Sequence, residues 1–293
     1  MIRAILRRSF PIALLAVTLL TGSAGAQIIE PPLEDNDEGL AYTALTTTPV
    51  GAFAPMAEIP SLWGSTGRMQ VHGQISTQDQ GAGASNRNFA LGLTVPTGFG
   101  LLRFTAGLID YVCDDDELFP PGEGFDLDCG AGYMGGVDAT IPLIRPFLGG
   151  ESASAVSANL VVSFGASTND VAKISYEDPF DPAFSTTIDV TGTSWSAAVG
   201  IPLSFIAKSG ETIVIPHLTP RIGYGSAKAK IEAEIEGDEQ ELSLKGADLR
   251  PMLGAGVDIL FGQSGFGLGL GIQKVFADES EVLVGINLSF RAR

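Results

Sequence analysis

Few residues of this sequence have the types and spacing that hydrolytic chemistry requires. His217 precedes Thr219 by two positions, and Asp258 falls on a later segment that could lie beside them. A histidine oriented by a carboxylate can activate a hydroxyl nucleophile. However, threonine is a weak nucleophile, and His217 falls in the middle of its segment rather than at an end. We therefore expect no catalytic residues, and a hydrolase is the third-ranked alternative.

A second candidate motif is the glycine-rich run Gly265-Phe-Gly-Leu-Gly-Leu-Gly271. Its glycines fall at every second position, without the two-residue gap and following helix that a dinucleotide-binding loop needs. Small side chains on one face of a strand explain this spacing better. We expect no nucleotide cofactor.

Acidic residues gather between the two cysteines, Cys113 and Cys129. Calcium prefers several oxygen ligands on a flexible loop, but the spacing does not match an EF-hand, and acidic surface loops are commonly only solvated. A calcium ion is thus the one cofactor considered, and solvation is the favoured interpretation. The candidate ligands are Asp114, Asp115, Asp116, Glu117, Asp126 and Asp128, with Glu123 also in the loop.

The N-terminus has the three parts of a cleaved secretory signal: basic Arg3, Arg7 and Arg8, a short apolar run over 11–20, and an Ala-x-Ala site at 24–26. We assign residues 1–26 to this signal and export to the general secretion pathway. Cys113 and Cys129 then lie in an oxidising compartment and are expected to form a disulfide, which the loop-closure model values at about 3 kcal/mol.

Residues 27–66 are acidic and proline-rich and differ from the rest of the chain. Prolines exclude them from a central strand. Two alternatives remain: a periplasmic tail, which we favour, and a plug that folds into the barrel described next.

From residue 67 onward, segments with period-two alternation recur. Hydrophobic residues make up 45% of the chain, yet no apolar run after the signal is long enough for a membrane helix. Dispersed apolar residues favour an all-β fold, a closed antiparallel transmembrane barrel over 67–293. We expect about ten strands, within limits of 8–12, near 67–76, 88–96, 100–112, 130–143, 156–167, 193–205, 211–225, 247–261, 265–275 and 281–290.

The connections alternate between long and short, as in barrels whose two ends both lie in the periplasm. The long ones include 113–129, 168–192 and 226–246, and the arm over 226–246 alternates well enough to continue as a hairpin above the membrane. Outward aromatic residues fall near the strand ends, as two interfacial girdles would require. These are Phe89, Tyr133, Phe164, Trp195 and Tyr224 near the outer ends, and Phe104, Phe266 and Phe290 near the inner ends.

Polar residues alternate onto the lumen face. A turn at Pro120–Pro121 places Arg103 opposite Asp138, and a turn at Gly237–Asp238 places His217 opposite Asp258, although a one-residue slip would break either pair. The favoured interpretation is a packed, paired polar lumen, and the alternative is a narrow passive channel for small solutes. The expected lumen network comprises Arg68, His72, Arg103, Asp138, His217, Arg221, Arg250 and Asp258, together with Gln70, Gln74, Gln273 and Asn287.

The last strand, 281–290, carries Gly285, Leu288 and Phe290 in the spacing of a barrel-insertion signal. In this segment and in its overall pattern the chain resembles small bacterial outer-membrane β-barrels of the broad opacity and porin-like class. The resemblance implies a Gram-negative outer membrane, with lipid and the barrel-assembly machinery as partners. A formal charge of −17 and the lack of basic clusters exclude nucleic acid as a partner.

The function we expect is non-enzymatic: a surface barrel that acts through acidic extracellular loops in adhesion or in the cell envelope, with a surface ligand that the sequence does not name. The narrow channel is the second-ranked hypothesis and an outer-membrane hydrolase the third.

Overall fold

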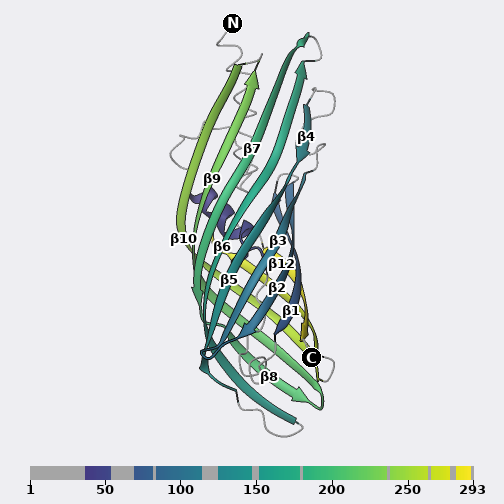
Figure 1. Ribbon diagram of the computed structural model, residues 1–293, viewed down its shortest axis with the longest axis vertical. Coiled ribbons are helices and arrows are strands. Elements are labelled where there is room, and N and C mark those ends of the chain that lie inside the picture. The colour runs from purple at the N-terminus through teal and green to yellow at the C-terminus, as the bar shows by residue number, and fades with distance from the viewer. Residues whose placement is uncertain are drawn as a thin grey trace.

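The computed structural model of this chain describes residues 37–53, 69–81, 84–113, 125–146, 152–178, 181–235, 238–262, 265–277 and 282–291. They form one helix, α2 (Asp37–Thr47), and a twelve-stranded sheet (Figure 1). None of the described helices is long and apolar enough to span a membrane. The strands are β1 (Gln70–Gly81), β2 (Ala84–Pro96), β3 (Leu101–Cys113), β4 (Phe125–Cys129), β5 (Ala131–Ile144), β6 (Ser152–Asp178), β7 (Asp181–Gly200), β8 (Leu203–Ser209), β9 (Thr212–Ile235), β10 (Asp238–Phe261), β11 (Phe266–Val275) and β12 (Val282–Arg291).

The sheet closes on itself through ten strands. Pairing runs β1–β2–β3–β5–β6–β7–β9–β10–β11–β12, and β12 pairs back onto β1. Each pairing is antiparallel. β8 continues the place of β7 beyond Ile201–Pro202, and β4 adds to β6 at the other end. The predicted closed antiparallel barrel with ten strands in its ring is therefore confirmed.

The wall of the barrel is apolar outside and polar inside. On β12, Val284, Ile286, Leu288 and Phe290 are exposed, whereas the residues between them are buried. The same holds on β1, where Gln70, His72, Gln74 and Ser76 are buried in the lumen. A water-soluble sheet would bury its apolar face, so this inverted pattern defines the fold as that of an outer-membrane β-barrel.

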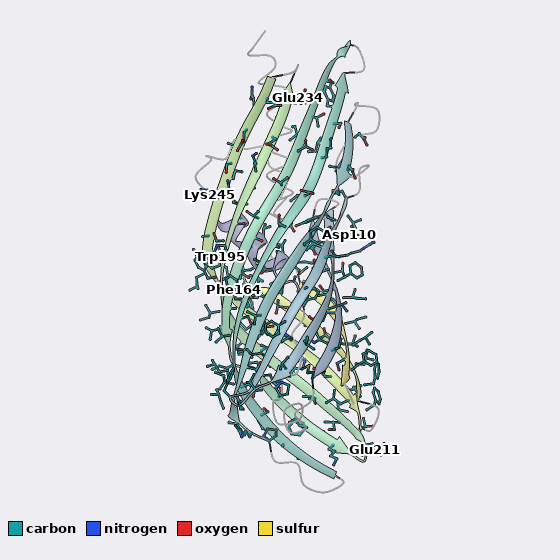
Figure 2. All side chains as sticks on the ribbon, in the orientation of Figure 1. Asp110, Phe164, Trp195, Glu211, Glu234 and Lys245 are labelled. Carbon is teal, nitrogen blue, oxygen red and sulfur yellow. A yellow bond between two sulfur atoms is a disulfide. The ribbon has the colours of Figure 1, made fainter. Side chains whose placement is uncertain are left out.

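Two bands of aromatic side chains mark the limits of the apolar wall. Phe164, Trp195 and Tyr224 lie on three successive strands, with ring centroids 6.2 and 5.2 Å apart (Figure 2). At the other end Phe266 stacks between Phe261 and Phe290 at 5.8 and 5.2 Å. Aromatic rings favour the interface between lipid and water, so these bands set the depth of the barrel.

Beyond the first band, β6, β7, β9 and β10 continue as two long hairpins. The prediction of a long loop over 168–192 is wrong, because the described residues of this range, 168–178 and 181–192, belong to β6 and β7. The hairpin predicted over 226–246 is present. Figure 1 shows both hairpins at the top of the barrel and the C-terminus near its lower end.

The polarity of the wall reverses where these hairpins begin. On β9, outward Ile222 and Tyr224 are followed by outward Lys228 and Glu232. The inward side changes from polar to apolar, and its buried residues cluster with those of neighbouring strands: Val171, Ala172, Ile174, Ile188, Val190, Ala227, Ala229 and Ile231. Charged residues outside and apolar residues inside are what water requires, so the reversal marks the end of the lipid-facing wall. We call this upper part of β4, β6, β7, β9 and β10 the surface sheet.

Candidate functional site

The segment 37–53 lies inside the barrel. α2 packs against β7, β9 and β10, and Leu40 and Ala44 join the apolar cluster of the surface sheet. Acidic residues at its start and Pro49 just after its end suit the two ends of a helix. For these residues the favoured interpretation of a periplasmic tail is corrected to the plug alternative, because they bury apolar side chains against the lumen wall.

The plug continues from the helix across the lumen. Leu45 and Val50 pack with Ala198, Met252 and Val275. Further along, Ala52 and Phe53 pack with Ala90, Ile109 and Met134 on the opposite side of the lumen. The segment thus contacts strands around most of the barrel, near the height of the upper aromatic band.

Hydrogen bonds fix the plug to the polar wall. The hydroxyls of Thr47 and Ser194 lie 3.1 Å apart, and those of Thr48 and Ser196 are also paired. The wall also donates to backbone carbonyls of the plug: Gln273 Nε2 to Gly51 at 2.8 Å, Asn88 Nδ2 to Ala52 at 3.3 Å, Ser76 Oγ to Ala52 as well, and Arg221 to Val50 at 3.4 Å. A segment without strand partners here satisfies its backbone through side chains of the wall.

Glycines in the wall leave room for these close contacts. A Cβ atom on Gly165 would lie 2.9 Å from Pro49 Cδ, and one on Gly136 would lie 3.1 Å from Pro49 Cβ. On the other side a Cβ at Gly223 would lie 2.8 Å from Leu45. The wall therefore lacks side chains where the plug approaches it closely.

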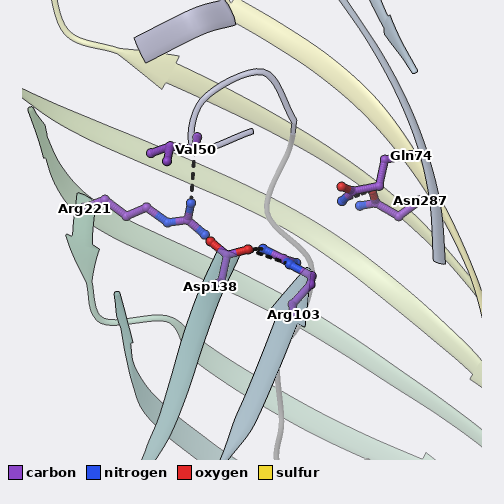
Figure 3. A network of polar contacts seen from close by, with 6 residues as sticks. All are labelled: Val50, Gln74, Arg103, Asp138, Arg221 and Asn287. Carbon is purple, nitrogen blue, oxygen red and sulfur yellow. Dashed lines mark hydrogen bonds and ion pairs between the residues drawn. The ribbon is translucent and has the colours of Figure 1, made fainter. Parts of the chain in front are cut away.

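An ion pair lies directly beside the plug. Arg103 on β3 stands opposite Asp138 on β5, and its Nε and Nη2 each lie 2.7 Å from Asp138 Oδ2. Figure 3 shows Arg221 on the other side of the same carboxylate, reaching up to Val50. Asp138 is therefore paired with Arg103 and lies close to a second guanidinium group, that of Arg221, which also donates to the plug. The register expected for Arg103 and Asp138 is the one observed.

His217 and Asp258 meet in a different register from the one predicted. The hairpin turns one residue earlier, with Ile235 opposite Asp238, so His217 stands opposite Gly256. A shift of two positions keeps both side chains in the lumen, and His217 Nε2 lies 3.4 Å from Asp258 Oδ2 on the diagonal. The His217 ring fills the space over Gly256. Thr219 is fully buried on the same face, so neither residue stands at an accessible rim.

The other expected lumen residues lie at several heights along the wall. His72 is buried over Gly92, and Gln74 donates to Asn287 at 2.8 Å (Figure 3). Arg250 lies higher, within 2.7 Å of Asp248. Gln70 is also buried, whereas Arg68 lies outside the described residues.

The predicted disulfide is present. Cys113 ends β3, Cys129 ends β4, and the bond joins them across a Cα–Cα distance of 6.0 Å. Of the candidate calcium ligands, Asp126 and Asp128 are exposed on β4, on the side opposite buried Leu127. Asp114–Glu117 and Glu123 lie outside the described residues, within which no group of three or more metal-ligating side chains occurs. The calcium site stays a prediction.

The outer face of the surface sheet is acidic near its tips. A concave pocket of about 400 Å³ is lined mainly by Asp189, Glu232, Glu234, Glu239 and Glu241. Lys230 lies 2.5 Å from Glu232 and 3.4 Å from Glu241, and the Glu232 carboxylate raises the pKa of the Lys230 amine above its usual value. The surface that this sheet presents therefore combines a majority of carboxylates with a few lysines.

Sequence reasoning missed the plug contacts. The signal was present in Thr46-Thr47-Thr48-Pro49, small hydroxyl residues between a helix and a proline, and in the unexplained inward glycines 136, 165 and 223. Neither observation alone says that the two sets meet, because they are far apart in the chain.

Comparisons with known proteins agree with the fold and go no further. No family model and no curated protein matches the chain. Among solved structures, it is similar to the translocator domain of the autotransporter NalP from Neisseria meningitidis, at 12% identity over 77% of this chain and 88% of that one, with a TM-score of 0.36. A major outer membrane protein from Thermus thermophilus has 12% identity over 77% and 98%, with a TM-score of 0.35. The outer membrane protease OmpT from Escherichia coli has 5% identity over 81% and 99%, with a TM-score of 0.34.

Proposed function

We propose that this protein is a non-enzymatic barrel of the Gram-negative outer membrane that acts at the cell surface through its acidic hairpins, in adhesion or in the organisation of the envelope. The observation that carries the proposal is the surface sheet. Its strands run beyond the aromatic band with charged residues outside and apolar residues inside, while the plug packs against the lumen wall beneath them. A closed barrel with a rigid projecting sheet is suited to presenting a surface.

The first test is topological. Lys245→Cys lies on the surface sheet, and Glu211→Cys lies at the opposite end of the barrel (Figure 2). Both described cysteines are in the disulfide, so each variant carries one free thiol. A membrane-impermeant maleimide should label the first on intact cells and the second only after lysis. Labelling of Glu211→Cys alone would reverse the orientation and reject the proposal.

The second test removes the hairpin and keeps the barrel. Replacing residues 229–244 by Asn-Gly leaves Lys228 paired with Lys245 across a two-residue turn. The shortened protein should keep its heat-modifiable gel mobility. Outer-membrane vesicles carrying it should attach to polylysine-coated glass several-fold less than vesicles with the full chain. Equal attachment would mean that the acidic hairpin is not the acting surface.

A narrow passive channel is the second candidate function, and one observation favours it. Ser204, His217 and Thr219 are buried on the lumen face with side-chain atoms that make no hydrogen bond to the residues that the structure describes. Buried polar atoms of this kind usually bind water. A water-filled lower lumen would conduct only if the plug moved away from the wall. Planar-bilayer conductance of the full chain therefore separates the surface function from the channel function.

A further inference from the structure

The strand β10 has an open edge in the surface sheet. β11 pairs with β10 only from Met252 to Phe261, whereas β9 pairs with it along its whole length. Within the part of the chain that the structure describes, Asp238–Arg250 therefore has a strand partner on one side only. Along a strand this length is about 40 Å of backbone.

The backbone groups on this edge can be assigned from two hydrogen bonds. Phe276 N–H donates to Pro251 O at 2.9 Å, and Leu249 N–H donates to Asp248 Oδ1 at 2.6 Å. The backbone groups of Leu249 and Pro251, two odd-numbered residues of β10, therefore point away from β9. Proline has no N–H, so Pro251 presents only its carbonyl oxygen on that side. The N–H and C=O of one residue point to the same side of a strand, and those of the next residue point to the other side. The open edge therefore also presents the backbone groups of the odd-numbered residues Glu239, Glu241, Ser243, Lys245 and Ala247.

An open edge of this length is a template for another strand, and natural proteins protect such edges with charges. Here the charges are self-complementary. If two β10 edges pair antiparallel about Ser243, Glu241 of each copy stands opposite Lys245 of the other. On the other face, Leu242 of each copy stands opposite Leu244 of the other.

Among the described residues of a single chain, two side chains of β10 lack such partners. Lys245 is exposed at the margin of the sheet, its cross-strand neighbour is Lys228, and the described residues place no carboxylate against it (Figure 2). Leu242 is 41% exposed although it stands opposite buried Ile231 on the apolar face. A second copy of the chain would give Lys245 a carboxylate and Leu242 an apolar neighbour.

We propose that the open edge of β10 binds the same edge of a second copy of this chain, antiparallel and centred on Ser243. This inference rests on the proposed surface function and names its partner. A twofold axis perpendicular to the strands turns the second barrel upside down, so the two copies stand on opposed membranes. The interaction is therefore homotypic adhesion between cells or vesicles.

Charge exchange tests the pairing. In vesicles, Glu241→Lys places lysines opposite each other, and Lys245→Glu does the same with carboxylates. Each variant alone should aggregate about tenfold less than the unchanged protein, because two exposed pairs change from attraction to repulsion. Mixing the two variants, or combining both substitutions in one chain, should restore aggregation. The matched control Glu234→Lys, on a strand with neighbours on both sides, should aggregate as the unchanged protein does.

A cross-link gives a second measurement that does not depend on aggregation. Ser243→Cys should form a dimer with a short thiol-specific linker, since the two residues meet at the axis. Lys245→Cys should form one only with Glu241→Cys and not with itself. Failure of rescue in the mixture, or cross-linking of Lys245→Cys alone, overturns the pairing. Surface labelling of Lys245→Cys on intact cells is independent of either result and reports on the proposed function alone.

Discussion

Asp138 lies between Arg103 and Arg221, so a single carboxylate in the lumen joins strands β3, β5 and β9 and, through Val50, the plug (Figure 3). Buried charges cost free energy unless they are paired. The Arg221 guanidinium also donates to the carbonyl of Val50 in the plug.

Removing the shared carboxylate should cost more than removing one of its partners. Asp138→Leu removes the carboxylate beside both Arg103 and Arg221 and should lower the free energy of unfolding by about 3–5 kcal/mol. Arg103→Leu leaves Asp138 next to Arg221 and should cost less. Urea unfolding of the refolded barrel in detergent, followed by tryptophan fluorescence, measures both. Equal losses would show that Arg221 does not share the carboxylate.

Adding a side chain at one of the wall glycines that contact the plug should displace the plug. Gly165→Ala puts a methyl group 2.9 Å from Pro49, and overpacking of this kind costs about 1–3 kcal/mol. We expect a rise in the open-channel conductance in planar bilayers. Gly135→Ala is the matched control, because its methyl group would lie 3.8 Å from the nearest atom, the Thr105 carbonyl oxygen. If Gly165→Ala does not raise the conductance, then the plug tolerates the added methyl group or the lower lumen is closed as well.

Loss of the disulfide should loosen the rim and leave the barrel intact. Cys113→Ser with Cys129→Ser removes a closure across 16 residues, worth about 3 kcal/mol in the loop model. Because β4 pairs only with the upper part of β6, the effect should be local. Limited proteolysis should cut near β4 sooner, with an unchanged heat-modifiable shift. A lost shift would instead place the disulfide among the determinants of barrel assembly.

Charges on the outer wall should cost according to depth. Leu91 is 71% exposed midway along β2, and Leu249 is 59% exposed where the wall changes polarity. If lipid surrounds the first but barely the second, Leu91→Arg should cost about 2–4 kcal/mol and Leu249→Arg about 0–1 kcal/mol. Folding into lipid vesicles measures the difference. Similar costs at both positions would be inconsistent with the assigned membrane boundary.

Much of the wall could be predicted from the sequence because its pattern is local. Side chains alternate with period two, so apolar and polar residues sort onto two faces wherever a strand forms. The same arithmetic, applied across the loop with Pro120 and Pro121, gave the Arg103–Asp138 register. It failed for His217 and Asp258 because the turn shifts by one residue, a displacement that local alternation does not register.

An antiparallel barrel with a lipid-facing surface, a polar lumen and one disulfide follows from local sequence patterns. The entry of the segment 37–53 into the lumen does not, since its contacts with Gly165, Ser194 and Gln273 depend on strands more than a hundred residues away. The extension of β10 beyond β11, which leaves an edge open, is likewise visible only in the folded chain. Both are properties of how strands end relative to one another in space, and no single segment of the chain encodes them.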